Sequence, residues 1–145
     1  MKKLLTCVVT LFILTTPLSA QRPQLNALIV AVDANNELTP GFSFTPTFYN
    51  NWVYFSMNGI ILFVREGGFK FFPSVDSGLR LTFDKSAIET GVGFVLLEHD
   101  GLDQANLTAN ITYVRSRDQN TDYVIKVSPI INSRRGMMVS AGIRF

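Results

Sequence analysis

The residues of this chain that could do chemistry are few and poorly spaced for it. The one histidine, His99, lies between two carboxylates in Glu98-His99-Asp100-Gly101. A metal or catalytic centre needs several such side chains around one point, whereas an aspartate followed by a glycine is typical of a turn. We interpret this segment as a hydrophilic turn at a strand end. No nucleophile-elbow, phosphate-binding-loop or zinc-protease motif occurs either, so we expect no enzymatic activity, no cofactor and no metal.

Six charged residues are the other candidates, and what they do depends on the elements that position them. They are Lys70, Asp76, Arg80, Glu89, Lys126 and Arg144. Each lies in a segment where polar and apolar residues alternate, and each has the polar parity of its segment. Residues of one parity share a face of a β-strand. The six charges are therefore predicted to point to the same side of one sheet.

The strand pattern is clearest from Phe69 to Phe83, where the apolar residues are odd-numbered and the charged ones even-numbered. This parity survives the turn-like residues 76–78, so we predict one long strand, with a hairpin at that point as the alternative. Asn58-Gly59 is a hairpin signal within a second long segment, which leaves the same two interpretations open. Eight strands are predicted, or ten if these segments divide. Their approximate ranges are 24–33, 39–48, 52–65, 68–83, 86–98, 104–115, 121–131 and 136–145.

The first twenty residues are expected to be a cleaved signal peptide. Their start is basic, an apolar run extends from Leu4 to Leu14, and small residues lead to Ala20. The run is too short for a membrane anchor, which needs about 20 residues. We predict cleavage between Ala20 and Gln21, so that residues 21–145 form the mature domain.

Composition limits the class of protein further. Removing the two signal-peptide lysines from the 13 basic residues leaves 11, equal to the 11 acidic residues. This balance argues against a nucleic-acid partner. The one cysteine, Cys7, lies in the signal peptide, so the mature chain is no disulfide scaffold. A content of 47% hydrophobic residues excludes a disordered chain.

The fold then depends on which face of the sheet is outside. A soluble periplasmic β-sandwich would bury its apolar faces, whereas a membrane barrel turns them to lipid and keeps polar residues inside. Several predicted strands reach about ten residues, enough for a tilted crossing, and aromatic residues near strand ends suit the two membrane interfaces. These are Tyr49, Trp52, Phe69, Phe83, Tyr113, Tyr123 and Phe145. We predict an all-β, antiparallel transmembrane barrel of eight strands in the outer membrane, surrounded by its lipid, with the sandwich as the alternative.

Inside such a barrel the six charges either line an ion path or binding site, or neutralise one another as a salt-bridged plug. An eight-stranded barrel is wide enough only for its own side chains, so we favour the plug. The corresponding function is structural or scaffolding. A narrow pore or small-ligand carrier and a lipid-modifying enzyme are the alternatives.

The last strand resembles the terminal strand of outer-membrane barrels. Ala141, Ile143 and Phe145 form an apolar face that alternates with polar or small residues and ends in a C-terminal aromatic side chain. In those barrels the barrel-assembly machinery recognises such an ending. The resemblance therefore implies that machinery as a partner.

A narrower resemblance covers residues 128–145. The matching stretches are Ser128-Pro129-Ile130-Ile131, Arg134-Arg135 and Ala141-Gly142-Ile143-Arg144-Phe145. They are similar to the C-terminus of the MipA/OmpV family of outer-membrane barrels. Some members are described as scaffolds that join a murein hydrolase to a murein synthase, and others are linked to osmotic response or adhesion. The resemblance implies a scaffolding role with murein-processing proteins as partners.

Overall fold

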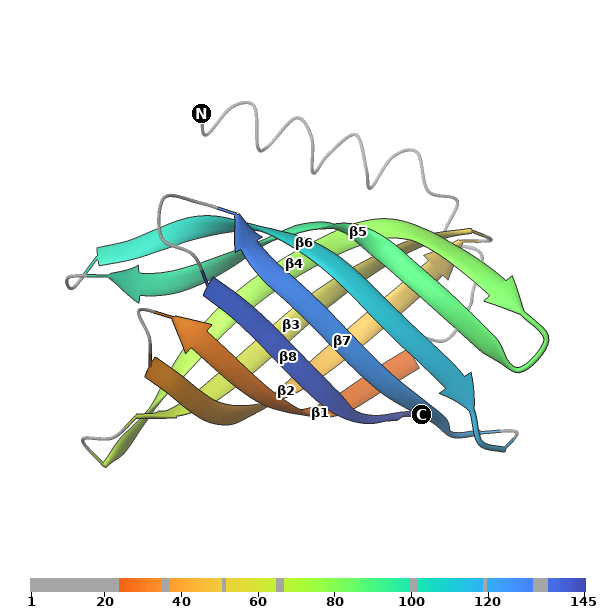
Figure 1. Cartoon of the computed structure of the whole chain (residues 1–145), viewed down its shortest axis with the longest axis horizontal. Helices are drawn as coiled ribbons and strands as arrows, with labels where there is room; N and C mark the ends of the chain where they lie inside the picture. Colours follow the sequence, from red (N-terminus) through yellow and green to blue (C-terminus); the bar gives the residue numbers. More distant parts are fainter. Residues whose placement is uncertain are drawn as a thin grey trace.

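The computed structural model describes residues 24–34, 37–50, 52–64, 67–99, 102–118, 120–131 and 136–145, which form eight antiparallel strands closed into a barrel (Figure 1). Each strand pairs with the next along the chain, and β8 pairs with β1. The strands are β1 (Gln24–Ala34), β2 (Glu37–Asn50), β3 (Val53–Val64), β4 (Gly68–Phe83), β5 (Ser86–His99), β6 (Leu102–Ser116), β7 (Asp122–Ile131) and β8 (Gly136–Arg144). The predicted eight-stranded barrel is confirmed, and the two-sheet sandwich is excluded. The described residues contain no helix that is long and apolar enough to cross a bilayer.

Both long segments whose continuity was open are single strands. β3 pairs with β4 on both sides of Asn58 and Gly59. β4 continues through Gly78, which lies directly opposite Gly91 of β5. A Cβ on Gly78 would lie 2.1 Å from the Thr90 carbonyl oxygen, so this glycine permits a close approach of two strands and does not form a turn. The ten-stranded alternative is therefore wrong.

Successive side chains alternate between an apolar exterior and an enclosed interior. On β1, for example, Ile29 is 75% exposed while Leu28 and Val30 are 5% and 3% exposed. On β4, Phe71 is exposed while Asp76 is buried. An apolar exterior of this extent requires lipid around it. The prediction that the apolar faces point outward is confirmed.

The barrel has two ends, which we name by what lies there. The terminal end holds residues 24 and 145 and the connections β2–β3, β4–β5 and β6–β7; the hairpin end holds the other four connections (Figure 1). All the connections are short, between two and five residues. At the hairpin end, Gly67 follows β3 with a φ of 83°, which glycine adopts without steric cost.

At the hairpin end β4 and β5 separate, although both strands continue. Their pairing stops at Ser74 and Val95. The Arg80 N–H donates to the Trp52 carbonyl, which precedes β3, so even-numbered residues of β4 bond toward β3 and odd-numbered residues face β5. Pro73 therefore faces β5 with a nitrogen that has no hydrogen to donate. The β3–β4 and β5–β6 hairpins diverge beyond this point (Figure 1).

The interior has two halves of different character. The apolar half, toward the hairpin end, is built around a cluster of Val30, Val32, Ile60, Leu62, Phe72, Val95, Ile130 and Met138. Buried polar residues lie opposite members of this cluster on neighbouring strands, namely Ser43, Asn106, Thr108, Ser128 and Ser140. The polar half, toward the terminal end, contains the buried charges together with a smaller apolar group of Leu28, Ala87, Val114 and Val124. Inward residues of β1 belong to both apolar groups, which explains why the first strand is apolar on both faces.

Candidate functional site

The polar half contains a carboxylate that donor groups from three other strands surround. Glu89 on β5 is 2% exposed. Arg144 on β8 donates from Nη1 to Oε1 at 2.8 Å and from Nη2 to Oε2 at 3.0 Å. The Tyr49 hydroxyl on β2 and Arg80 Nη1 on β4 donate to Oε1 at 2.8 and 3.1 Å. We call these four residues the Glu89 cluster. Charge-assisted bidentate bonds are strong and directional, so the cluster ties opposite walls of the barrel together.

Tyr49 also lies against both guanidinium groups of the cluster. The Arg80 Cζ is 4.5 Å from the centre of its ring, and the Arg144 Cζ is 5.5 Å from it. The negative face of an aromatic ring attracts a cation at such distances, which offsets part of the repulsion between two neighbouring arginines. Arg144 donates further from Nε to Asn26 on β1. The hydrogen bonds of the cluster therefore extend across the junction between the last strand and the first.

A second carboxylate, Asp76 on β4, is bonded separately. Lys126 on β7 reaches it from the opposite wall with Nζ 2.7 Å from Oδ2. Asn58 on β3 donates to the same oxygen at 2.8 Å and to the Ser74 hydroxyl at 2.8 Å. We call these residues the Asp76 cluster. Together the two clusters match buried carboxylates with cations, as buried charges require.

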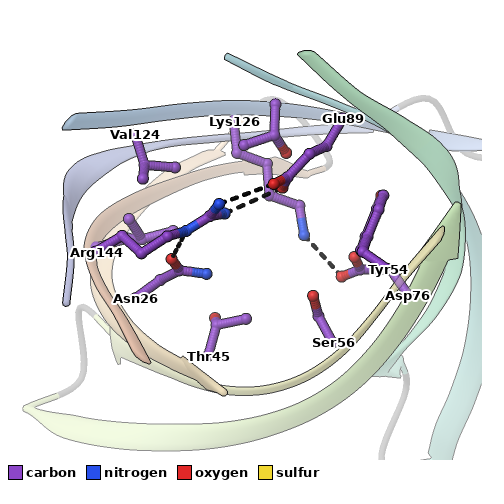
Figure 2. A pocket seen from close by; sticks show the side chains of 11 residues that line it. Asn26, Thr45, Tyr54, Ser56, Asp76, Glu89, Val124, Lys126 and Arg144 are labelled. Carbon is purple, nitrogen blue, oxygen red and sulfur yellow. Dashed lines mark hydrogen bonds and ion pairs between the residues drawn. The ribbon is translucent and has the colours of Figure 1, made fainter. Parts of the chain in front are cut away.

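Between the clusters a small cavity remains, of about 10 Å³. Most of the residues that line it are polar or charged, and they converge from strands around the barrel (Figure 2). Within the described part of the chain, Tyr54 Oη and Thr45 Oγ1 line it without a hydrogen-bond partner. A volume of this size holds about one water molecule, and no set of three or more metal-ligating acidic, His or Cys side chains occurs among the described residues. The cavity has no room for an organic ligand.

Five of the six charges singled out in the sequence lie in these clusters, in the arrangement of a salt-bridged plug. Lys70 differs. It has the same parity on β4, but its side chain is exposed, because it lies beyond Ser74, where β4 and β5 separate. The prediction that Lys70 faces the lumen is therefore wrong.

The prediction that Tyr49 is one of the aromatic residues at the membrane interface is also wrong. Its hydroxyl bonds inside the lumen, and it has the parity of the buried Thr45 and Thr47 on β2. Asn26 and Tyr54, which were not predicted as lumen residues, are buried inside. The parity of these residues in the sequence could have placed them, because polar residues with the parity of the inward face belong to the lumen whatever their size.

The proposed assembly residues lie on the outer face of β8. Ala141 and Phe145 are exposed, and Ile143 is partly covered. The backbone of Phe145 exchanges two hydrogen bonds with Leu25, of 3.0 and 3.2 Å, which extends the β8–β1 seam to the end of the chain.

Two predictions concern segments that the structure describes only in part or not at all. The predicted turn after His99 falls at the connection between β5 and β6, where His99 pairs with Leu102. The predicted signal peptide, residues 1–20, and its cleavage point between Ala20 and Gln21 lie outside the described residues.

Comparison with known proteins finds likeness in structure only. The chain is similar to a de novo designed transmembrane β-barrel (TM-score 0.60, 11% identity, 86% of this chain and 98% of that one). It is also similar to the Yersinia pestis outer membrane protein Ail in a phospholipid nanodisc (0.52, 14%, 85% and 99%) and to the N-terminal barrel domain of Pseudomonas aeruginosa OprF (0.50, 12%, 86% and 98%). No protein-family model and no curated protein matches the chain.

The fold is that of an outer-membrane β-barrel. The structural likeness supports this fold, and the exposed apolar side chains around the barrel require lipid. The protein is therefore an envelope protein of the outer membrane, as the sequence predicted.

Proposed function

We propose that this chain is a non-conducting structural barrel that serves as a scaffold in the cell envelope. The observation that carries the proposal is that both halves of the lumen are filled. One half is crossed by the bonded Glu89 and Asp76 clusters, and the other is packed with apolar side chains. A barrel whose interior is occupied acts through its surface.

The narrow-pore alternative is disfavoured by the same observation. An ion crossing the lumen would have to displace Arg144 from Glu89. It would then have to enter an apolar half in which Val95 is completely buried, and an apolar constriction resists wetting. A small-ligand carrier needs a cavity, and the one between the clusters holds about one water molecule.

The scaffolding role comes from the resemblance of residues 128–145 to the MipA/OmpV family, which implies murein-processing proteins as partners. The short connections support contacts made by the barrel rims and outer face, because no connection exceeds five residues. The long loops that often carry recognition in other proteins are absent between the eight strands that the structure describes.

We also propose that the barrel-assembly machinery recognises the last strand. Phe145 is 56% exposed at the outer end of β8, where another protein has access to it during insertion. Deleting Phe145 is expected to reduce assembly in the outer membrane and increase degradation in the periplasm. Normal abundance and normal heat-modifiable migration on gels in the deletion variant would contradict this role.

Two measurements test the main proposal. In planar bilayers the purified barrel is expected to give no channel steps, while the Glu89→Ala variant serves to show whether breaking the plug opens one. From crosslinked envelopes, the tagged barrel is expected to co-purify murein hydrolases or synthases more strongly than a tagged unrelated eight-stranded barrel does. Regular conductance steps in the wild type would favour the pore, and altered lipid A on deletion of the gene without murein partners would favour the enzyme.

A further inference from the structure

Three cations gather on the outer rim at the terminal end of the barrel. Lys85 lies in the β4–β5 turn, Arg115 is the second-last residue of β6, and Arg117 directly follows β6. The Ser116 N–H donates to the Lys85 carbonyl at 2.9 Å, so the turn is held against the end of β6. Lys85 and Arg115 are 30 positions apart in the chain. The β5–β6 pairing brings them together, since Arg115 lies opposite Ser86. We call Lys85, Arg115 and Arg117 the basic patch.

The side chains of the basic patch are open to solvent, and Arg117 interacts electrostatically with the neighbouring Asp118. All three side chains are exposed, and none of them forms an ion pair within the described part of the chain. Arg117 lies over the Tyr123 ring, with its Cζ 5.7 Å from the ring centre. This contact positions the guanidinium without cancelling its charge.

Three carboxylates lie near the basic patch. Asp118 is exposed next to Arg117 and stays charged while it accepts a hydrogen bond from the Asn120 backbone N–H at 2.9 Å. Asp122 has lumen parity and lies opposite Arg144. Asp84 is exposed in the same turn as Lys85. Counting the exposed Asp84 and Asp118 against the three cations leaves one net positive charge on the outer rim here.

Below the patch, the outward side chains change in a definite order toward the middle of the barrel. On β6, Arg115 is followed by Tyr113 and then by Ile111, which is 60% exposed. On β7, Tyr123 is followed by Ile125. Cation, phenol and aliphatic side chain succeed one another in the order in which phosphate, ester linkage and acyl chain succeed one another in a phospholipid. Tyrosine is also typical of the membrane interface.

We propose that the basic patch is a binding site for the headgroup of an anionic phospholipid in the leaflet around the terminal end. Guanidinium groups bind phosphate oxygens in a planar, bidentate manner, and Lys85 adds a further positive charge. Among the described residues, the other cations near the terminal end are inside the barrel, in the Glu89 and Asp76 clusters. The lipid is therefore held on one side of the rim, along β5, β6 and β7. The proposal depends on the membrane placement and not on the scaffolding role.

Spin-labelled lipids test this site. The barrel is reconstituted in phosphatidylcholine vesicles at low ionic strength, and the fraction of motionally restricted label is compared for spin-labelled phosphatidylglycerol and phosphatidylcholine. One cation near an anionic lipid is worth about a fivefold preference, so the wild type should prefer phosphatidylglycerol at least to this extent, and high salt should abolish the preference. The triple variant Lys85→Gln, Arg115→Gln, Arg117→Gln should lose it.

Two single variants serve as controls. Lys70→Gln removes an exposed lysine at the opposite end and should leave the preference unchanged, whereas Asp84→Asn should raise it. Heat-modifiable migration of each variant shows that it has folded. The site would be disproved if the triple variant kept the wild-type preference, or if Lys70→Gln reduced it equally. An absence of restricted label for both lipids would overturn the membrane placement itself, and neither result depends on whether murein enzymes co-purify.

Discussion

The two halves of the lumen are filled by opposite means. In the polar half, charged side chains bond one another across the barrel at defined atoms; in the apolar half, hydrocarbon side chains pack without specific partners. Removing one member of a buried ion pair leaves a charge that is neither hydrated nor paired, whereas removing an apolar side chain leaves a cavity that its neighbours partly fill. The polar half should therefore be the more sensitive to substitution and the more exact in its geometry.

The largest effect is expected from Glu89→Ala. It leaves Arg144, whose side chain is 2% exposed, without its carboxylate, and it also removes the acceptor of Tyr49 and Arg80. The free energy of unfolding should fall by about 3–5 kcal/mol. Urea titration of the barrel in lipid vesicles, followed by heat-modifiable migration, measures it.

Glu89→Gln is the matched control for this change. It keeps the size of the side chain and one carbonyl acceptor but removes the charge, so its effect should lie between those of the wild type and Glu89→Ala. If Glu89→Ala lowered the free energy of unfolding by only about 1 kcal/mol or less, as expected for an exposed ion pair, the Glu89 cluster would be hydrated. The two halves of the lumen would then not differ in this respect.

In the apolar half, Leu62→Ala should cost about 2–4 kcal/mol, within the range for truncating a buried leucine. Leu62 is 4% exposed and belongs to the apolar cluster. The same urea titration applies, and Phe63→Ala, whose side chain faces lipid and is 51% exposed, is the control. If Leu62→Ala cost more than Glu89→Ala, the order of the two halves would be reversed.

The Asp76 cluster allows the contrast to be tested within one pair. Asp76→Leu or Lys126→Met alone leaves an unpaired charge, whereas the double variant makes this position resemble the apolar half. The double variant should be more stable than the sum of the two single effects predicts, by about 1–3 kcal/mol. This effect is smaller than that expected for Glu89→Ala because the Lys126 side chain is 15% exposed and water screens the pair. Simple additivity in the double-mutant cycle would show that the two side chains do not interact.

The smallest effect is expected outside the lumen, at Asp118. The Asn120 amide donates a hydrogen bond to its carboxylate, which lowers the pKa of Asp118. A lowered pKa means that the bond is present above the ordinary pKa of aspartate and is lost as the pH falls through the lowered value. In an NMR titration the Asn120 amide shift should therefore have a midpoint below that of an ordinary aspartate. Asp118→Ala should abolish this titration without a measurable change in barrel stability, because water replaces the exposed bond.

The strands and their inward and outward faces could be read from the sequence because alternation is a local property. Each peptide of an extended chain turns its side chain to the opposite side from the last, so the odd-numbered phenylalanines of residues 69–83 had to share a face. The two long strands were harder to predict. Gly78 lies in Asp76-Ser77-Gly78, a sequence typical of a turn. Only the register, which places Gly78 opposite Gly91, shows that this glycine allows two strands to approach closely.

The candidate site needed more than alternation. Parity places Glu89 and Arg144 inside, but which cation meets which carboxylate depends on how far each strand is staggered around the closed barrel. These two residues are 55 positions apart in the chain, and no local pattern relates them. The same holds for the basic patch, where a turn residue and the end of β6 become neighbours through the β5–β6 register.

The sequence by itself thus determined the alternation of the strands, the residues that share each face and the set of charges available to the lumen. The tertiary structure alone decided that there are eight strands, which charges pair, that Lys70 lies beyond the enclosed lumen, and that an apolar cluster forms toward the hairpin end. The physical reason is that a strand's periodicity is set by its own backbone geometry, whereas depth along the barrel and contacts across it are set by register and closure, to which all eight strands contribute at once.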